Sequence, residues 1–154
     1  MCREARRRRV TFAIRPLGDA DADAAVALWH EVGLTRPWND PHADFARALA
    51  TWPELLLGAF ADEAADGEVL VGTVLGGYDG HRGWVYYLAS APSHRGAGIG
   101  RALMAEIERR LEAQGCPKLQ LMVRSDNTSV LAFYDHLGYA VNEVAVLGKR
   151  LIAD

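Results

Sequence analysis

One short unit constrains this chain more than any other: a strand, a glycine-rich turn and an amphipathic helix follow one another from residue 84 to residue 111. The apolar run at 84–90 (WVYYLAS) predicts the strand. Glycines alternate through the turn at Gly96, Gly98 and Gly100, and one face of the helix carries Ile99, Leu103, Ile107 and Leu111. Alternating glycines let backbone amides point into one space at the positive end of the helix dipole. The unit therefore predicts an anion site, most naturally for a phosphate.

This turn does not follow the two common nucleotide-binding motifs. No Gly-Lys-Ser/Thr comes after it, which excludes a P-loop, and the third glycine of a dinucleotide fingerprint would fall on Arg101. Arg95 and Arg101 place mobile cations on either side of the turn. From these residues alone, a tight turn without a ligand stays an alternative.

The remaining pattern predicts one domain over 11–154, behind a basic and disordered arm at 1–10 that holds five arginines and one glutamate. Besides 84–90, we expect strands at 11–17, 55–61, 68–76, 118–123, 139–145 and 146–152. We expect helices from the acids at 19–23 to Val32, over 42–51, from Ile99 to Gly115, and from Asn127 to Leu137. A glycine-rich loop is expected at 76–83.

Charge and cysteine usage exclude several classes of protein. The net charge of −3 argues against a general nucleic-acid binder, which needs a basic face. Cys2 and Cys116 have no neighbouring ligand spacing, so we expect no metal and a reduced, cytoplasmic protein. No apolar run is long enough for a membrane span, and we expect no membrane partner. Monomer and homodimer are both compatible with the sequence.

Two motifs together resemble a known family. Arg95, Gly98 and Gly100 match the coenzyme A signature of the GNAT N-acetyltransferase superfamily, and 127–139 (NTSVLAFYDHLGY) is similar to its Asn…Phe-Tyr…Leu-Gly-Tyr block. The segments 36–41, 76–83, 115–118 and 147–152 resemble those of a bacterial subgroup, the YpeA-type acetyltransferases. The resemblance implies an α+β fold, an αβα sandwich. Its mixed, mostly antiparallel sheet has six to seven strands, the fourth and fifth splayed, and about four helices flank it.

The resemblance also implies acetyl-CoA as co-substrate and assigns residues to it. The pantetheine arm would pair with the backbone of Leu88, Ala89 and Ser90, and Asn127 would contact the pantetheine or phosphate region from the other side. Asn127 is equally well explained as a helix N-cap. The pyrophosphate would lie on the amides of Gly96, Ala97, Gly98, Ile99, Gly100 and Arg101, and Arg95 would also bind the cofactor. The backbone N–H of Leu88 would donate to the oxyanion, and Tyr134 would protonate the leaving thiolate.

The acceptor is expected to be a primary amine of a small molecule, peptide or protein. Two polar loops are candidates to bind it, through Arg36, Trp38, Asn39, Asp40, Asp79 and His81. The strand at 84–90 begins without an acid, so the general base stays open among Tyr86, Asp79, His81 and Glu31. The leading hypothesis is an acetyl-CoA-dependent N-acetyltransferase. The alternative is a non-catalytic acyl-CoA-binding sensor or regulatory module, which would need the phosphate turn but not Tyr134.

Overall fold

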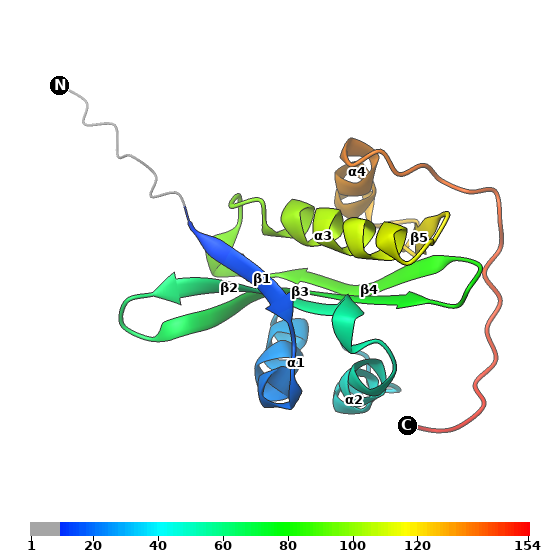
Figure 1. Cartoon of the computed structure of the whole chain (residues 1–154). Helices are drawn as coiled ribbons and strands as arrows, with labels where there is room; N and C mark the ends of the chain where they lie inside the picture. Colours follow the sequence, from blue (N-terminus) through cyan, green and yellow to red (C-terminus); the bar gives the residue numbers. More distant parts are fainter. Residues whose placement is uncertain (1–9) are drawn as a thin grey trace.

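A five-stranded sheet with the order β1-β2-β3-β4-β5 forms the centre of the computed structural model, which describes residues 10–154 (Figure 1). Its strands are β1 (Phe12–Pro16), β2 (Leu56–Glu63), β3 (Gly67–Tyr78), β4 (Gly83–Ser90) and β5 (Leu119–Leu121). The first four strands are antiparallel, and β5 runs parallel to β4. The predicted basic arm lies outside the described residues except for Val10.

Helices cover both faces of this sheet, two on each side (Figure 1). One face carries α1 (Ala22–Glu31) and α2 (Pro41–Thr51), and the other carries α3 (Ile99–Ala113) and α4 (Thr128–His136). Three short 3₁₀ turns complete the elements, at Asp19–Asp21, Pro53–Leu55 and Pro92–His94. The predicted α+β sandwich with about four helices is therefore confirmed. In the part of the chain that the structure describes, no helix has both the length and the apolar character needed to cross a bilayer.

Helix α3 lies against the backbone of β3 because two glycines leave no side chain between them. The four predicted apolar residues of α3 are all at most 2% exposed. A Cβ built at Gly72 would lie 2.4 Å from Ile99 Cγ2, and one at Gly76 would lie 2.7 Å from Ile107 Cδ1. These glycines permit close approach of helix and sheet. This close contact fixes the height of the first turn of α3 above the sheet.

The glycine-rich loop predicted at 76–83 is wrong in its extent. Strand β3 continues through Gly76 and Gly77 to Tyr78, and β4 begins at Gly83, so the connection is only 79–82. Gly77 lies in the strand because the ring of Trp52 packs over it, with ring atoms 3.5 Å from the position of a Cβ. The two glycines serve packing against helices rather than a flexible loop.

A β-bulge interrupts β4 opposite β3. Leu75 pairs with Tyr86 and Thr73 pairs with Ala89, so Tyr87 and Leu88 together face Val74. Tyr87 has φ +51°, which is uncommon for a bulky residue. Neighbouring residues of a regular strand point to opposite faces, and an inserted residue breaks that rule. The bulge therefore lets Tyr86 and Tyr87 face the same cavity, which is described below.

The predicted strands at 139–145 and 146–152 are absent from the structure, so the sheet has five strands rather than six or seven. Their β-branched and apolar composition favours a strand, but composition cannot provide the partner that a ladder needs. The segment instead runs along the outside of the molecule from α4 toward α2 (Figure 1). Arg47 pairs with the side chain of Asp154 at 3.0 Å, and Arg150 donates to Asn39 Oδ1 at 3.3 Å.

Candidate active site

The two strands at the end of the sheet diverge, as predicted. β4 and β5 pair only from Gly83 to Val85, because β5 ends at Leu121 while β4 continues to Ser90. The half of β4 that contains Leu88, Ala89 and Ser90 therefore has no partner in β5. An extended ligand with amide groups could pair with this exposed backbone edge.

The turn before α3 leaves backbone donors available beside this opening. Gly98 is the N-cap residue, with φ +79°, and no side chain caps the helix. The amides of Gly98, Ile99, Gly100 and Arg101 donate to no backbone carbonyl among residues 10–154. No atom lies within 4 Å of a Cβ built at Gly96 or Gly98, and both glycines are exposed at the surface. Free amides at a helix N-terminus attract anions.

Tyr134 lies in α4, where its ring is buried and its hydroxyl makes no hydrogen bond with the described residues. Its ring meets Phe133 and Tyr139 edge-on, with centroids 5.1 Å and 5.6 Å away. It lines a wide groove of about 1390 Å³ between β5 and α4. Burial raises the pKa of Tyr134 to about 12, so the phenol stays protonated at neutral pH and has a proton to donate.

Asn127 is the N-cap of α4. Its side-chain oxygen accepts a hydrogen bond from the Val130 amide at 3.4 Å, which confirms the capping interpretation. A contact between Asn127 and coenzyme A stays a prediction.

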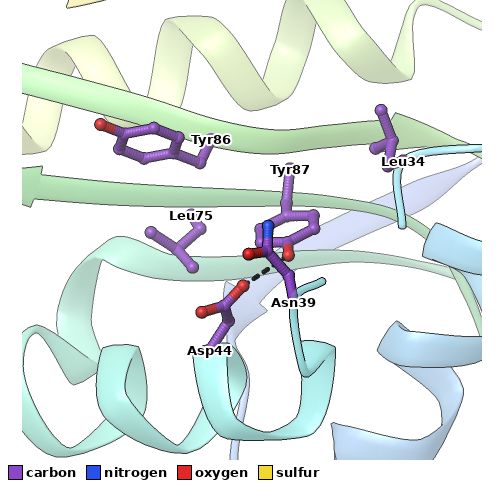
Figure 2. Close-up of a pocket in the computed structure, with 6 residues that line it drawn as sticks. All are labelled: Leu34, Asn39, Asp44, Leu75, Tyr86 and Tyr87. Atoms are coloured by element: carbon purple, nitrogen blue, oxygen red, sulfur yellow. Dashed lines mark hydrogen bonds between the residues drawn. The ribbon is translucent and has the colours of Figure 1, made fainter. Parts of the chain in front are cut away.

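A second cavity, of about 430 Å³, opens on the face of β4 toward α2 (Figure 2). Tyr86 and Tyr87 reach it from the bulge, and Asp44 faces them from α2. The hydroxyl of Tyr87 donates to Asp44 Oδ2 at 2.6 Å. Burial and then the hydrogen bond to Asp44 raise the pKa of Tyr87 above its ordinary value, so this hydroxyl remains a donor. The cavity is lined by Leu34, Asn39, Asp44, Leu75, Tyr86 and Tyr87.

A buried polar chain holds the bulge in place. The Trp29 indole N–H donates to Thr73 Oγ1 at 2.8 Å, and the Thr73 hydroxyl donates to the carbonyl of Tyr87 at 2.9 Å. The ring of Tyr87 stacks on Trp29, with centroids 3.9 Å apart and planes 16° apart. Trp29 and Thr73 are completely buried. The position of Leu88, the predicted oxyanion donor, therefore depends on this chain through the neighbouring Tyr87.

The first predicted acceptor loop lies at the edge of this cavity, and its side chains have different surroundings. Asn39 lines the cavity. Arg36 donates to the carbonyls of Gly33 and Thr35, whereas Trp38 is 56% exposed. Asp40 caps α2 by accepting the amides of residues 42 and 43.

The other candidates for the general base or for acceptor binding lie at different places. Tyr86 lines the cavity and is 44% exposed. Asp79 and His81 lie in the turn between β3 and β4, where Asp79 accepts the amides of His81 and Arg82 at 2.7 Å. These amide bonds lower the pKa of Asp79. Glu31 is the exposed last residue of α1. Neither Asp79, His81 nor Glu31 is among the residues that line the cavity.

Sequence reasoning missed Asp44, Tyr87 and Thr73 as parts of the site. Asp44 has the pattern of a solvent-exposed acid in the first turn of a helix. Tyr87 follows Tyr86, and regular alternation would place one of them on the opposite face of the sheet. The consecutive tyrosines in an otherwise apolar strand were the one available signal.

Comparisons with known proteins agree with this geometry. Residues 24–139 match the family model described as the acetyltransferase (GNAT) family. An acetyltransferase of Yersinia enterocolitica, YE1169, is 46% identical over 141 residues, covering 92% of this chain and 96% of the relative. Acetyltransferase ECA0875 of Pectobacterium atrosepticum is 48% identical over the same length, with the same coverage.

Solved structures share the fold at low sequence identity. AAC(6')-Iy in complex with a bisubstrate analogue of coenzyme A and acetylneamine superposes with a TM-score of 0.70 and 20% identity, over 92% of this chain and 99% of that one. The NatC complex bound to Gag peptide and CoA gives a TM-score of 0.71 and 21% identity, over 82% of each chain.

The divided sheet with a free helix N-terminus beside it is thus a fold that these two neighbours share, one with CoA bound and the other with a bisubstrate analogue that contains CoA. The family match and the relatives make the assignment specific. The chain belongs to the acetyltransferase (GNAT) family, and it is an N-acetyltransferase.

Proposed function

We propose that the enzyme uses acetyl-CoA and transfers the acetyl group directly to a primary amine of a small molecule, peptide or protein, with both substrates bound together. The observation that carries this proposal is the set of free amides at the start of α3, next to the unpaired half of β4. Gly96 and Gly98 are exposed, so a ligand can approach this turn from solvent.

The cofactor would lie along this opening. The pyrophosphate would accept from the amides of Gly96 and of 98–101, since the Ala97 amide, which was expected to take part, donates to the His94 carbonyl at 3.3 Å. Arg95 and Arg101, both of which are exposed, would flank it. The pantetheine arm would continue along Leu88, Ala89 and Ser90, in the place that a neighbouring strand would take. Tyr134 and Asn127 would approach it from α4 and its N-terminus. Coenzyme A supplies the thioester, and the protein supplies its orientation.

At the end of the pantetheine arm the reaction needs three protein groups: a donor to the oxyanion, an acid for the leaving thiolate and a base for the attacking amine. A neutral amine attacks the thioester carbonyl, and the resulting oxyanion accepts from the Leu88 N–H at the bulge. The C–S bond breaks, and the thiolate takes the proton of Tyr134. The attacking amine loses its own proton to a base among Tyr86, Asp79 and His81. Alignment of the two substrates contributes much of the rate.

The acceptor would enter from the α2 side of β4. Asn39 and Tyr86 line the cavity there, and Arg36, Trp38 and Asp40 belong to the loop that leads into it. Asp79 and His81 would approach from the turn after β3. Loops on a rigid sheet commonly determine specificity.

The test is free-thiol release from acetyl-CoA with a panel of primary amines. Thiol release that depends on the amine, together with the acetylated product, would support the enzyme. A protein that is thermally stabilised by acetyl-CoA but releases no thiol with any amine would instead be the acyl-CoA sensor.

A Gly98→Asp variant tests the cofactor site. The added carboxylate occupies the open space at the free amides and repels a phosphate, so the thermal stabilisation by acetyl-CoA should be lost. Gly67→Asp is the matched control, because Gly67 also has a positive φ, +69°, and a Cβ there also meets no atom within 4 Å, but it lies at the start of β3 rather than in this turn. An undiminished shift in Gly98→Asp would place the pyrophosphate elsewhere.

A further inference from the structure

Asp44 is the charged side chain among the six that line the cavity on the α2 side of β4. It faces Tyr86 and Tyr87 from the first turn of α2, and its side chain is 26% exposed (Figure 2). The other lining side chains are two leucines, two tyrosines and one asparagine. The cavity thus combines apolar and aromatic walls with one carboxylate.

The contacts of Asp44 leave it able to bind a cation. Oδ2 accepts from Tyr87, and Oδ1 pairs with Arg47 at 3.2 Å. Arg47 is 54% exposed and also pairs with Asp154 at 3.0 Å, so one guanidinium is shared by two carboxylates. A carboxylate has about four acceptor positions. An exposed ion pair at this spacing contributes little free energy, so it competes weakly with a ligand.

The position of Asp44 excludes it as the partner of the attacking amine. The Tyr87 side chain extends from the bulge into the cavity, and Asp44 lies beyond the hydroxyl at its far end. A full tyrosine side chain and a hydrogen bond thus separate the carboxylate from the backbone at Leu88, where the thioester carbonyl is proposed to lie. A carboxylate in contact with an amine also favours the charged ammonium form, which cannot attack.

We infer that Asp44 holds a second cationic group of the acceptor, remote from the amine that is acetylated, so that the preferred acceptors are diamines or other dibasic compounds. This inference rests on the proposed function for the position of the thioester. The charged end would lie against Asp44 and the Asn39 side chain. The methylene chain would pack on Leu34, Leu75 and the tyrosine rings, and the neutral amine would point toward Leu88.

Putrescine and cadaverine, compared with butylamine and pentylamine, test this inference. Each pair differs by one amino group, so the ratio of kcat/KM for the diamine over the monoamine measures the contribution of the second charge. A charge-assisted hydrogen bond of ordinary strength predicts a ratio of about 10 to 100 in the wild type. Asp44→Asn should bring the ratio close to one, because the amide keeps an acceptor for Tyr87 but loses the charge. Asp44→Glu should retain a preference for the diamine.

The control is Asp23→Asn, which removes the same charge from the same face of the molecule at a side chain that is 98% exposed and pairs with His42. It should leave the ratio unchanged. If folded Asp44→Asn had the same ratio as the wild type, the inference would be overturned. Asp44 would then be a structural residue that connects α2 to β4 through Tyr87.

A binding measurement separates this inference from the proposed function. Thermal stabilisation by cadaverine in the presence of coenzyme A should be seen in the wild type and lost in Asp44→Asn. Diamine binding that depends on Asp44, without acetyl transfer to any amine, would refute the proposed function and leave Asp44 as a binding group for a cation only. Acetyl transfer to monoamines and diamines at the same rate, in the wild type and in Asp44→Asn, would support the proposed function and refute the inference.

Discussion

Thr73→Val should destabilise the protein by about 2–6 kcal/mol although the two side chains have nearly the same shape. Thr73 is completely buried, and its hydroxyl is bonded both to the Trp29 indole at 2.8 Å and to the Tyr87 carbonyl at 2.9 Å. Valine would leave one buried donor and one buried acceptor without partners. Each such loss costs about 1–3 kcal/mol. For a domain of this size, the sum corresponds to a fall in Tm of about 4–24 °C.

Urea unfolding measures this loss directly, since the midpoint should fall while the slope stays the same. Thr73→Ser keeps the hydroxyl and loses only a methyl group, so it should retain most of the stability. Thr51→Val is a surface control: Thr51 is exposed and bonds only to the Arg47 carbonyl in its own helix. If Thr73→Val were as stable as Thr73→Ser, the hydroxyl would not be what fixes the bulge. A loss of kcat/KM in Thr73→Val alone would connect the buried chain to Leu88.

Three further predictions concern the proposed chemistry. Tyr134→Phe should lower kcat by about 10- to 1,000-fold and leave acetyl-CoA binding nearly unchanged, because only the proton donor is removed; wild-type turnover would leave Tyr134 a packing residue. Folding raises the pKa of Tyr134 to about 12 from the usual 10, so its stabilising contribution is complete below pH 10 and disappears as the pH rises through 12. The difference in unfolding free energy between wild type and Tyr134→Phe should therefore change by about 2–3 kcal/mol across that range, and a constant difference would contradict the shift. Trp38→Ala should raise the acceptor KM without affecting acetyl-CoA affinity, as kinetics with each substrate varied in turn would show, whereas loss of folding would make Trp38 a structural residue.

Helices could be predicted from the sequence because their signals are local. Asp40 and Pro41 mark the start of α2 in the sequence. In the structure Asp40 is the N-cap and Pro41 is the first helical residue. The apolar stripe of α3 is likewise buried as predicted. Each of these signals lies within a few residues of the element that it specifies.

Strand pairing depends on residues far apart, and there the predictions were less accurate. The segment 139–152 has a composition suited to strands, yet its end is held by Arg47 and Asn39, more than a hundred residues earlier. Gly76 and Gly77 resemble loop residues until Ile107 and Trp52 are known to pack over them. Composition indicates the secondary structure that a segment favours, but whether a strand forms depends on whether a pairing partner is available.

In the candidate site, too, the features with a local sequence signal could be predicted, whereas those that depend on distant residues could not. The turn at 95–101 could be predicted because its three glycines lie close together in the sequence, at alternate positions of one short segment. The contact between Asp44 and Tyr87 joins residues 43 positions apart and depends on a bulge. No periodic pattern in β4 indicates that irregularity, so Asn39 and Tyr86 could be proposed for the α2 side of the site, whereas Asp44 and Tyr87 could not.

The bulge also changes which residues of β4 face the helices α1 and α2: even-numbered residues before it, and odd-numbered residues after it. Before it, the even-numbered Tyr86 faces the α2 cavity; after it, the odd-numbered Ala89 pairs with Thr73, whose hydroxyl faces α1. Ser90 pairs with Gly72, which faces α3. Deleting any one residue of 86–88 would remove the bulge: Ala89 and Ser90 would keep their partners and faces, but the two residues before Ala89 would then alternate between the faces, so two consecutive side chains could no longer reach the cavity. Variation in residue type is thus better tolerated here than variation in length, and a redesigned acceptor pocket must preserve the number of residues in this strand.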